Sequence, residues 1–93
     1  MIEKSYTITS DEGLHARPAS KLVSAVSPFS SEVKMLFKEK EVNLKSIMGV
    51  MSLGVSKGKT IKITADGSDE ESLMAKVDEL IIAEGLGEAE ATS

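Results

Sequence analysis

The alternation of apolar and polar residues predicts four β-strands. In the segment 2–9, Ile2, Tyr6 and Ile8 share one side, and Lys4 is the only polar residue among them. The same alternation recurs in the segments 33–37, 42–44 and 60–65. A short polar turn separates the second segment from the third, which predicts a hairpin.

Apolar residues at helical spacing predict two helices between these strands. The first follows a polar turn at 10–13 and covers 16–26, where the approach of Pro28 ends the pattern. The second is short, about two turns over 47–53, and Ser46 precedes it as an N-cap.

A third helix closes the pattern. Ser68 and Glu71 have the spacing of a capping box at its start, and Gly85 stands where a left-handed residue would end it. The order β-α-β-β-α-β-α predicts an α+β fold with helices on one face of an antiparallel sheet. We expect a single domain over 1–88 and a loose tail over 89–93.

Composition narrows the class of protein. With 93 residues, 41% hydrophobic and 28% charged, the chain can form one small globular core. We expect no membrane insertion and no secretory signal, and therefore a cytoplasmic protein. The chain has no cysteine and one histidine, so we expect no disulfide, no metal site and no cofactor. A net charge of −4 with only three aromatic residues argues against binding to nucleic acid, so we expect the partners to be proteins.

The only histidine, His15, stands where the first helix begins. The first amides of that helix, at Ala16 and Arg17, have no partner within it and favour an anion such as phosphate. Pro18 lies in the first turn of the helix, where a missing amide hydrogen costs little stability, and Gly13 lets the preceding loop approach the helix closely. The dipole and Arg17 favour a neutral ring, whose nitrogen lone pair can attack phosphorus. The structural alternative is that His15 is a surface N-cap and Arg17 a solvated charge.

The run 13–19, Gly-Leu-His-Ala-Arg-Pro-Ala, resembles the active-site signature of HPr, the histidine-containing phosphocarrier of the phosphoenolpyruvate-dependent sugar phosphotransferase system. The run 43–54 is similar to the regulatory segment of HPr from Gram-positive bacteria. The resemblance implies an open-faced β-sandwich of four strands under three helices. It also implies a monomer that takes a phosphoryl group on Nδ1 of His15 from Enzyme I and passes it to sugar-specific IIA components. Family members with a purely regulatory role have lost this histidine, which is present here.

The resemblance also implies a second site at Ser46. An HPr kinase/phosphorylase would phosphorylate it, and the product would bind a catabolite control repressor. Serine at a helix start is ordinarily only a cap, and both roles can coexist. A two-turn helix cannot bury all its apolar residues, so the resemblance assigns Ile47, Met48 and Met51, with Ser20, to a docking surface for partners.

Glu12 departs from the pattern, since relatives often carry a small hydroxyl residue there. Its carboxylate could weaken the pull on phosphate without abolishing transfer. Two other classes stay open on the residues alone. One is an acylphosphatase-like enzyme, which shares the element order, although the chain lacks a glycine-rich loop with an arginine after the first strand. The other is a regulatory module that binds without covalent chemistry.

Overall fold

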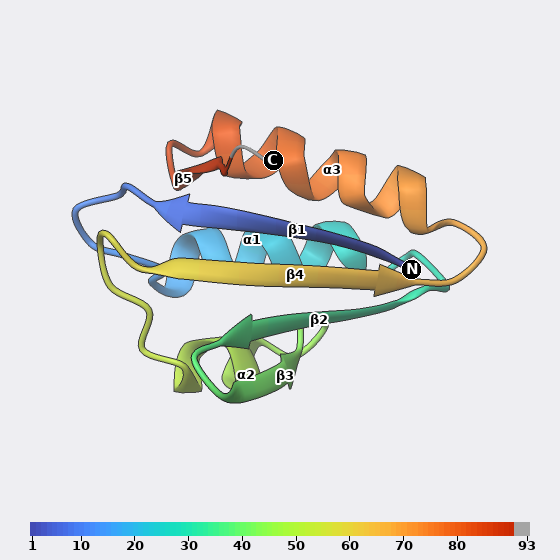
Figure 1. Ribbon diagram of the computed structural model, residues 1–93, viewed down its shortest axis with the longest axis horizontal. Coiled ribbons are helices and arrows are strands. Elements are labelled where there is room, and N and C mark those ends of the chain that lie inside the picture. Colours follow the sequence, from blue (N-terminus) through green and yellow to red (C-terminus); the bar gives the residue numbers. More distant parts are fainter. Residues whose placement is uncertain (91–93) are drawn as a thin grey trace.

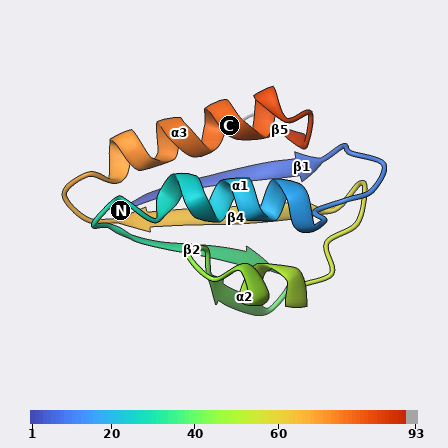
Figure 2. The same ribbon diagram turned by 180° about the vertical axis from the view of Figure 1, so that it is seen from behind.

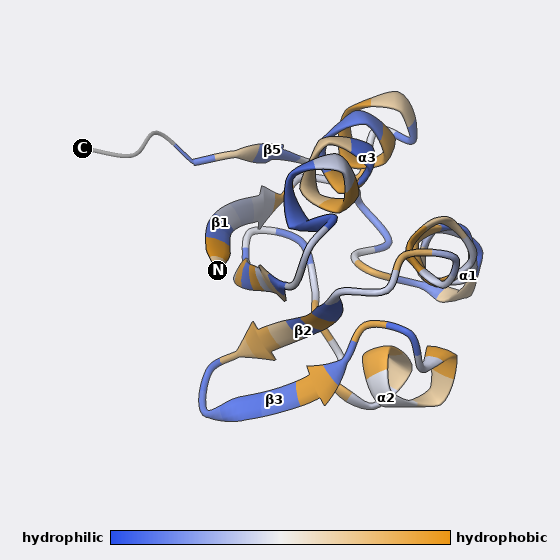
Figure 3. Ribbon diagram, turned by 90° about the vertical axis from the view of Figure 1, so that its right-hand side faces the viewer, coloured by the Kyte–Doolittle hydropathy of each residue, from blue (hydrophilic) through white to orange (hydrophobic). Residues whose placement is uncertain are grey.

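The computed structural model describes residues 1–90, which form one sheet with helices on one of its faces (Figures 1 and 3). The strands are antiparallel in the order β3-β2-β4-β1-β5. Figure 2 shows α1 lying across the sheet between α2 and α3. Among the described residues, no helix is long and apolar enough to cross a membrane. The elements are β1 Ile2–Ile8, α1 Ala16–Val26, β2 Glu32–Phe37, β3 Lys40–Asn43, α2 Ile47–Ser52, β4 Thr60–Asp66, α3 Glu70–Ala83 and β5 Gly87–Ala89.

The sheet has five strands where four were predicted, and the α+β class with helices on one face is confirmed. Strand β5 pairs Ala89 with Tyr6, so the start of the expected tail belongs to the sheet. Three residues are too few to show an alternation, and this strand is set by the turn before it. There Gly85 has φ +61, and the buried Leu86 donates its N–H to Ile81 at 3.0 Å. Residues 91–93 of that tail lie outside the described residues.

Lys4 is the polar residue on the apolar side of β1, and a contact with α3 accounts for its position. Its Nζ lies 3.1 Å from Oδ1 of Asp78, and the hydroxyl of Tyr6 donates to the same oxygen at 3.2 Å. Burial, reinforced by the Asp78 charge, raises the pKa of Tyr6. The long lysine stem can therefore cover the core while its charge is paired at the rim. The core between sheet and helices includes Tyr6, Ile8, Leu22, Val26, Val33, Met35, Ile61, Ile63, Leu73, Val77 and Ile81.

The predicted capping box at Ser68 is wrong. Helix α3 begins at Glu70 with Asp69 as its N-cap. The carboxylate that reaches back is that of Glu70, which accepts the N–H of Gly67 at 3.0 Å, and Glu71 makes no such contact. The helix start moved by one residue because the carboxylate of Asp69 bonds to the turn after α1.

Candidate functional site around His15

His15 lies at the start of α1, where the sequence placed it, and its backbone is the N-cap of the helix. Its backbone is extended, its carbonyl accepts the N–H of Ala19 at 3.1 Å, and its side chain makes no capping hydrogen bond. Ala16 and Arg17 are the first helical residues, so their N–H groups have no acceptor in the helix. Pro18 follows with no N–H to offer. The helix end therefore presents backbone donors directly beside the imidazole.

Glu12, His15, Ala16 and Arg17 line one open hollow at this helix end. Arg17 is exposed and makes no ion pair with any residue in 1–90. Its guanidinium is thus available to an anion. A larger hollow beside the β2–β3 turn holds no histidine, and its lining is Phe37, Lys38, Glu39, Lys40 and Leu53.

The loop that carries the site is fastened to the chain that follows α2. Gly13 has φ +67, and a Cβ there would collide with the carbonyl oxygen of Val55. Leu14 donates its N–H to that oxygen at 3.0 Å, and Lys57 binds Asp11 at 2.6 Å. The hydrogen bond from Lys57 lowers the pKa of Asp11. The close approach expected at Gly13 is therefore made to this second loop.

Nε2 of His15 lies 2.8 Å from Oε2 of Glu12, three residues earlier in the chain. The sequence predicts Glu12 only as a charge that opposes phosphate, and its contact with the ring was not predicted. The signal was the spacing, because the left-handed turn at Gly13 can bring side chains on either side of it together. The contact leaves Nδ1 as the ring nitrogen that Glu12 does not engage.

Ser46 is the N-cap of α2, as predicted. Its Oγ accepts the N–H of Gly49 at 3.0 Å, and its carbonyl accepts the N–H of Val50 at 3.1 Å. The side chain is half-buried. Ser46 does not line the hollow at His15, and the two residues cap different helices.

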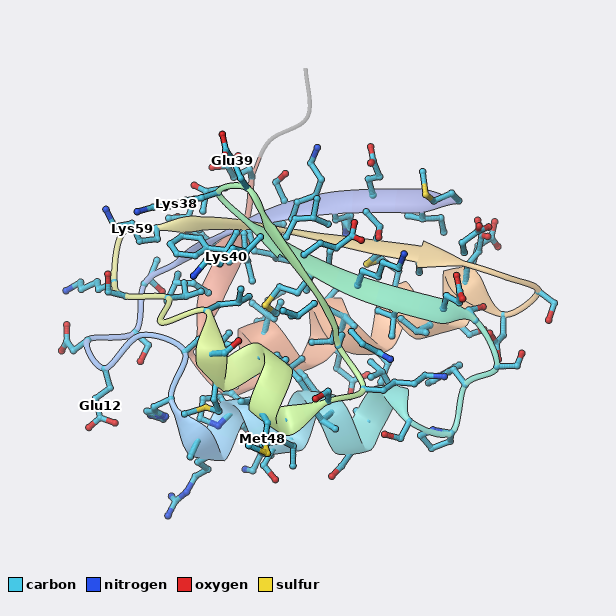
Figure 4. All side chains as sticks on the ribbon, turned by 90° about the horizontal axis from the view of Figure 1, so that it is seen from below. Glu12, Lys38, Glu39, Lys40, Met48 and Lys59 are labelled. Carbon is cyan, nitrogen blue, oxygen red and sulfur yellow. The ribbon has the colours of Figure 1, made fainter. Side chains whose placement is uncertain are left out.

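Helix α2 exposes the residues expected at a docking surface. Ile47, Met48 and Met51 are 43%, 84% and 40% exposed, whereas Val50 is buried. Figure 4 labels Met48 on α2. Because α2 packs against α1, where Ser20 is half-buried, this apolar surface adjoins the helix that begins at His15.

The chain matches the family model described as "PTS HPr component phosphorylation site" over residues 2–91. It is similar to the histidine-containing phosphocarrier protein of Mycoplasma, with 41% identity, 92% of this chain and 98% of that chain covered, and a TM-score of 0.90. Similarity to an HPr from Thermoanaerobacter tengcongensis is 45% identity over 91% and 96% of the two chains, with a TM-score of 0.85. It is also similar to the Bacillus subtilis catabolite repression protein Crh, with 37% identity, 90% of this chain and 97% of that chain covered, and a TM-score of 0.70.

These matches agree with the Gram-positive type that the sequence predicted. They favour a carrier over the acylphosphatase-like hydrolase that shares the element order, because the matched family is that of HPr. The chain therefore belongs to the HPr family, the phosphocarrier proteins of the phosphotransferase system.

Proposed function

We propose that His15 is the phosphoryl acceptor of this phosphocarrier, taking the group from Enzyme I and passing it to sugar-specific IIA components. The observation that carries the proposal is the imidazole at the free amide end of α1, in one hollow with the exposed Arg17. A helix N-terminus and a guanidinium both favour the doubly charged phosphoryl group. In this proposal the carrier is a cytoplasmic protein and works as a monomer.

Each group at this helix end has a role in the proposed transfer. The lone pair of a neutral ring nitrogen of His15 attacks phosphorus, while the bond from phosphorus to Enzyme I breaks and its electron pair stays with that donor. The N–H groups of Ala16 and Arg17 and the Arg17 side chain then bind the phosphoryl oxygens. Because the two N–H groups are held by the helix, they need little rearrangement when the charge arrives.

Incubation with phosphoenolpyruvate and Enzyme I tests the acceptor. We expect one acid-labile phosphoryl group per chain on wild-type protein and none on His15→Ala. Ser46→Ala is the matched control and should accept the group normally. Stoichiometric, phosphoenolpyruvate-dependent phosphate on the His15→Ala protein would refute the proposal. A protein that acts as a non-covalent regulatory module would retain its activity in that variant.

A regulatory role at Ser46 is the second part of the proposal, supported by the similarity to Crh, a catabolite repression protein. Phosphorylation of Ser46 by an HPr kinase/phosphorylase would place a charge beside the docking surface of Ile47, Met48, Met51 and Ser20. The phosphorylated form would then bind a catabolite control repressor. Both partners are to be tested with purified proteins and the Ser46→Ala control.

A further inference from the structure

The carboxylate of Glu12 is turned onto the ring that the proposed function makes the nucleophile. Its side chain is 75% exposed and free to extend into water, yet Oε2 lies 2.8 Å from Nε2 of His15. Figure 4 shows Glu12 extending from the loop that precedes α1. The neighbouring carboxylate, that of Asp11, is held by Lys57 at 2.6 Å. Glu12 is thus the carboxylate of this loop that faces the imidazole.

We propose that Glu12 is a positioning residue for His15: it fixes the ring proton on Nε2, presents Nδ1 to the phosphoryl donor, and pairs with the charge that the ring acquires. The inference rests on the proposed function of His15. Oε2 of Glu12 and Nε2 of His15 lie at ion-pair distance, and a negative carboxylate this close favours the tautomer whose proton is on the nearer ring nitrogen. In a neutral ring, the lone pair then lies on the other nitrogen. Nδ1 is unoccupied by any capping bond to the helix.

The same arrangement serves both halves of the cycle. During loading, the Nδ1 lone pair forms the N–P bond, and the electron pair of the breaking bond stays with the donor. The ring becomes a cation with its proton still on Nε2, opposite Glu12. During discharge, the N–P bond breaks and its electron pair returns to Nδ1, so a neutral ring leaves. No proton has to move, because Glu12 keeps Nε2 protonated throughout.

A carboxylate beside a phosphoryl site could instead act by repulsion, and the two roles predict opposite effects. If Glu12 mainly repels the incoming phosphoryl group, removing its charge should speed loading. If it positions the ring, removing the carboxylate should slow loading and allow the ring proton to occupy either nitrogen. Arg17 and the N–H groups of Ala16 and Arg17 are the positive groups at the same hollow. They offset the added charge of Glu12 where the phosphoryl group would bind.

Nitrogen NMR spectroscopy of the imidazole tests this directly in the free protein. We expect the wild-type ring to be protonated on Nε2, and both Glu12→Gln and Glu12→Ala, which lack the negative charge, to show both tautomers. Loading by Enzyme I should slow about two- to fivefold in both variants, the effect of losing one exposed charged contact. Glu39→Gln removes the same charge from the β2–β3 turn, away from Glu12 (Figure 4), and should match wild type.

The outcomes separate the two proposals. Glu12→Ala with a wild-type nitrogen spectrum, or with loading as fast as or faster than wild type, overturns the positioning role even though His15 is phosphorylated. Failure of His15 to accept any phosphoryl group overturns the proposed function, while the NMR comparison still reports on Glu12. Since Glu12 is exposed, all three variants should have the melting temperature of the wild-type protein, and this is to be checked first.

Discussion

Asp69 binds Ser31 across 38 residues of sequence, joining the start of α3 to the turn after α1. Oδ1 of Asp69 accepts the backbone N–H of Ser31 at 2.9 Å and also its hydroxyl, and Oδ2 accepts the N–H of Ser30 at 2.9 Å. Ser31 is only 2% exposed, so its polar atoms depend on this carboxylate. One side chain therefore satisfies the buried Ser31 beyond the C-terminal end of α1, opposite the end of that helix that carries His15.

This contact predicts a pH dependence of stability. The hydrogen bonds from Ser31 and Ser30 lower the pKa of Asp69 from its ordinary 3.8 to about 2. Since the folded protein binds the proton less tightly than the unfolded chain, the contribution is complete above 3.8 and is lost as pH falls towards about 2. We expect Asp69→Asn to melt several degrees lower near neutral pH. The gap to wild type should narrow across that acid interval.

Thermal unfolding followed at a series of pH values gives the measurement. Ser31→Ala is the companion variant, because it removes the hydroxyl and leaves the backbone donor. Its effect should be smaller than that of Asp69→Asn, and the two effects should not be additive. A gap between wild type and Asp69→Asn that stays constant down to about pH 2 would show that ionisation of Asp69 does not stabilise the fold.

A second prediction concerns Gly13, which joins the site loop to the chain after α2. Gly13→Ala forces a side chain into a left-handed conformation and against the carbonyl oxygen of Val55. Gly54 is the matched control, since it has φ +62 and a methyl group added there would meet nothing within 4 Å. We expect Gly54→Ala to cost about 1 kcal/mol of unfolding free energy from strain alone, and Gly13→Ala roughly 1–3 kcal/mol more. If denaturant titrations give the same loss of unfolding free energy for both variants, the backbone at Val55 moves away from the added methyl group at no measurable cost.

The strands and helices were predictable because their periodicity reports which side is buried. Val33 and Met35 on β2, and Leu73 and Val77 on α3, point to the core as their spacing requires. What failed depends on contacts between segments distant in sequence. Strand β5 exists because β1 offers it an edge, and Asp69 replaced Ser68 as the cap because Ser31 lies within reach.

The site shows the same division. The signature placed His15 at a helix start and left Arg17 exposed beside it, both of which the structure reproduces. The ring contact of Glu12 required knowing how the loop folds. That conformation is set by Gly13 against Val55, on a loop more than one element away. Side-chain partners of a catalytic group are therefore harder to predict than the group itself.

A third prediction separates transfer from folding at Arg17. The guanidinium is exposed and pairs with no residue in 1–90, so Arg17→Ala should keep its free energy of unfolding within about 0.5 kcal/mol of wild type. Loading from Enzyme I should slow about tenfold, the loss of one charged hydrogen bond to the phosphoryl group. Arg17→Lys keeps the charge without the forked donors and should recover part of the rate. A collapsed melting temperature with normal transfer by the folded fraction would make Arg17 structural.

The last prediction concerns Ser46, whose Oγ already accepts the N–H of Gly49 at the start of α2. A phosphate there meets free amides and a favourable dipole, so phosphorylation should leave the fold intact and stabilise it by about 0.3–1 kcal/mol. Ser46→Ala removes the cap and should cost about 1 kcal/mol. Calorimetry on the unmodified, phosphorylated and Ser46→Ala proteins gives these values. A markedly lower melting temperature of the phosphorylated form would contradict a purely surface effect.

The same phosphate should change which partner binds. It adds a charge of about −2 beside Ile47, Met48 and Met51, and a partner with an apolar surface must desolvate that charge on docking. Loading of His15 by Enzyme I should therefore need at least about tenfold more carrier, while a partner with a basic pocket gains affinity. Ser46→Asp should reproduce part of both effects, because it supplies about half the charge. Because Ser46 does not line the hollow at His15, phosphorylation at Ser46 should leave the nitrogen spectrum of the His15 ring unchanged. If loading slows and that spectrum also changes, the phosphate acts on the imidazole itself, and the docking explanation is wrong.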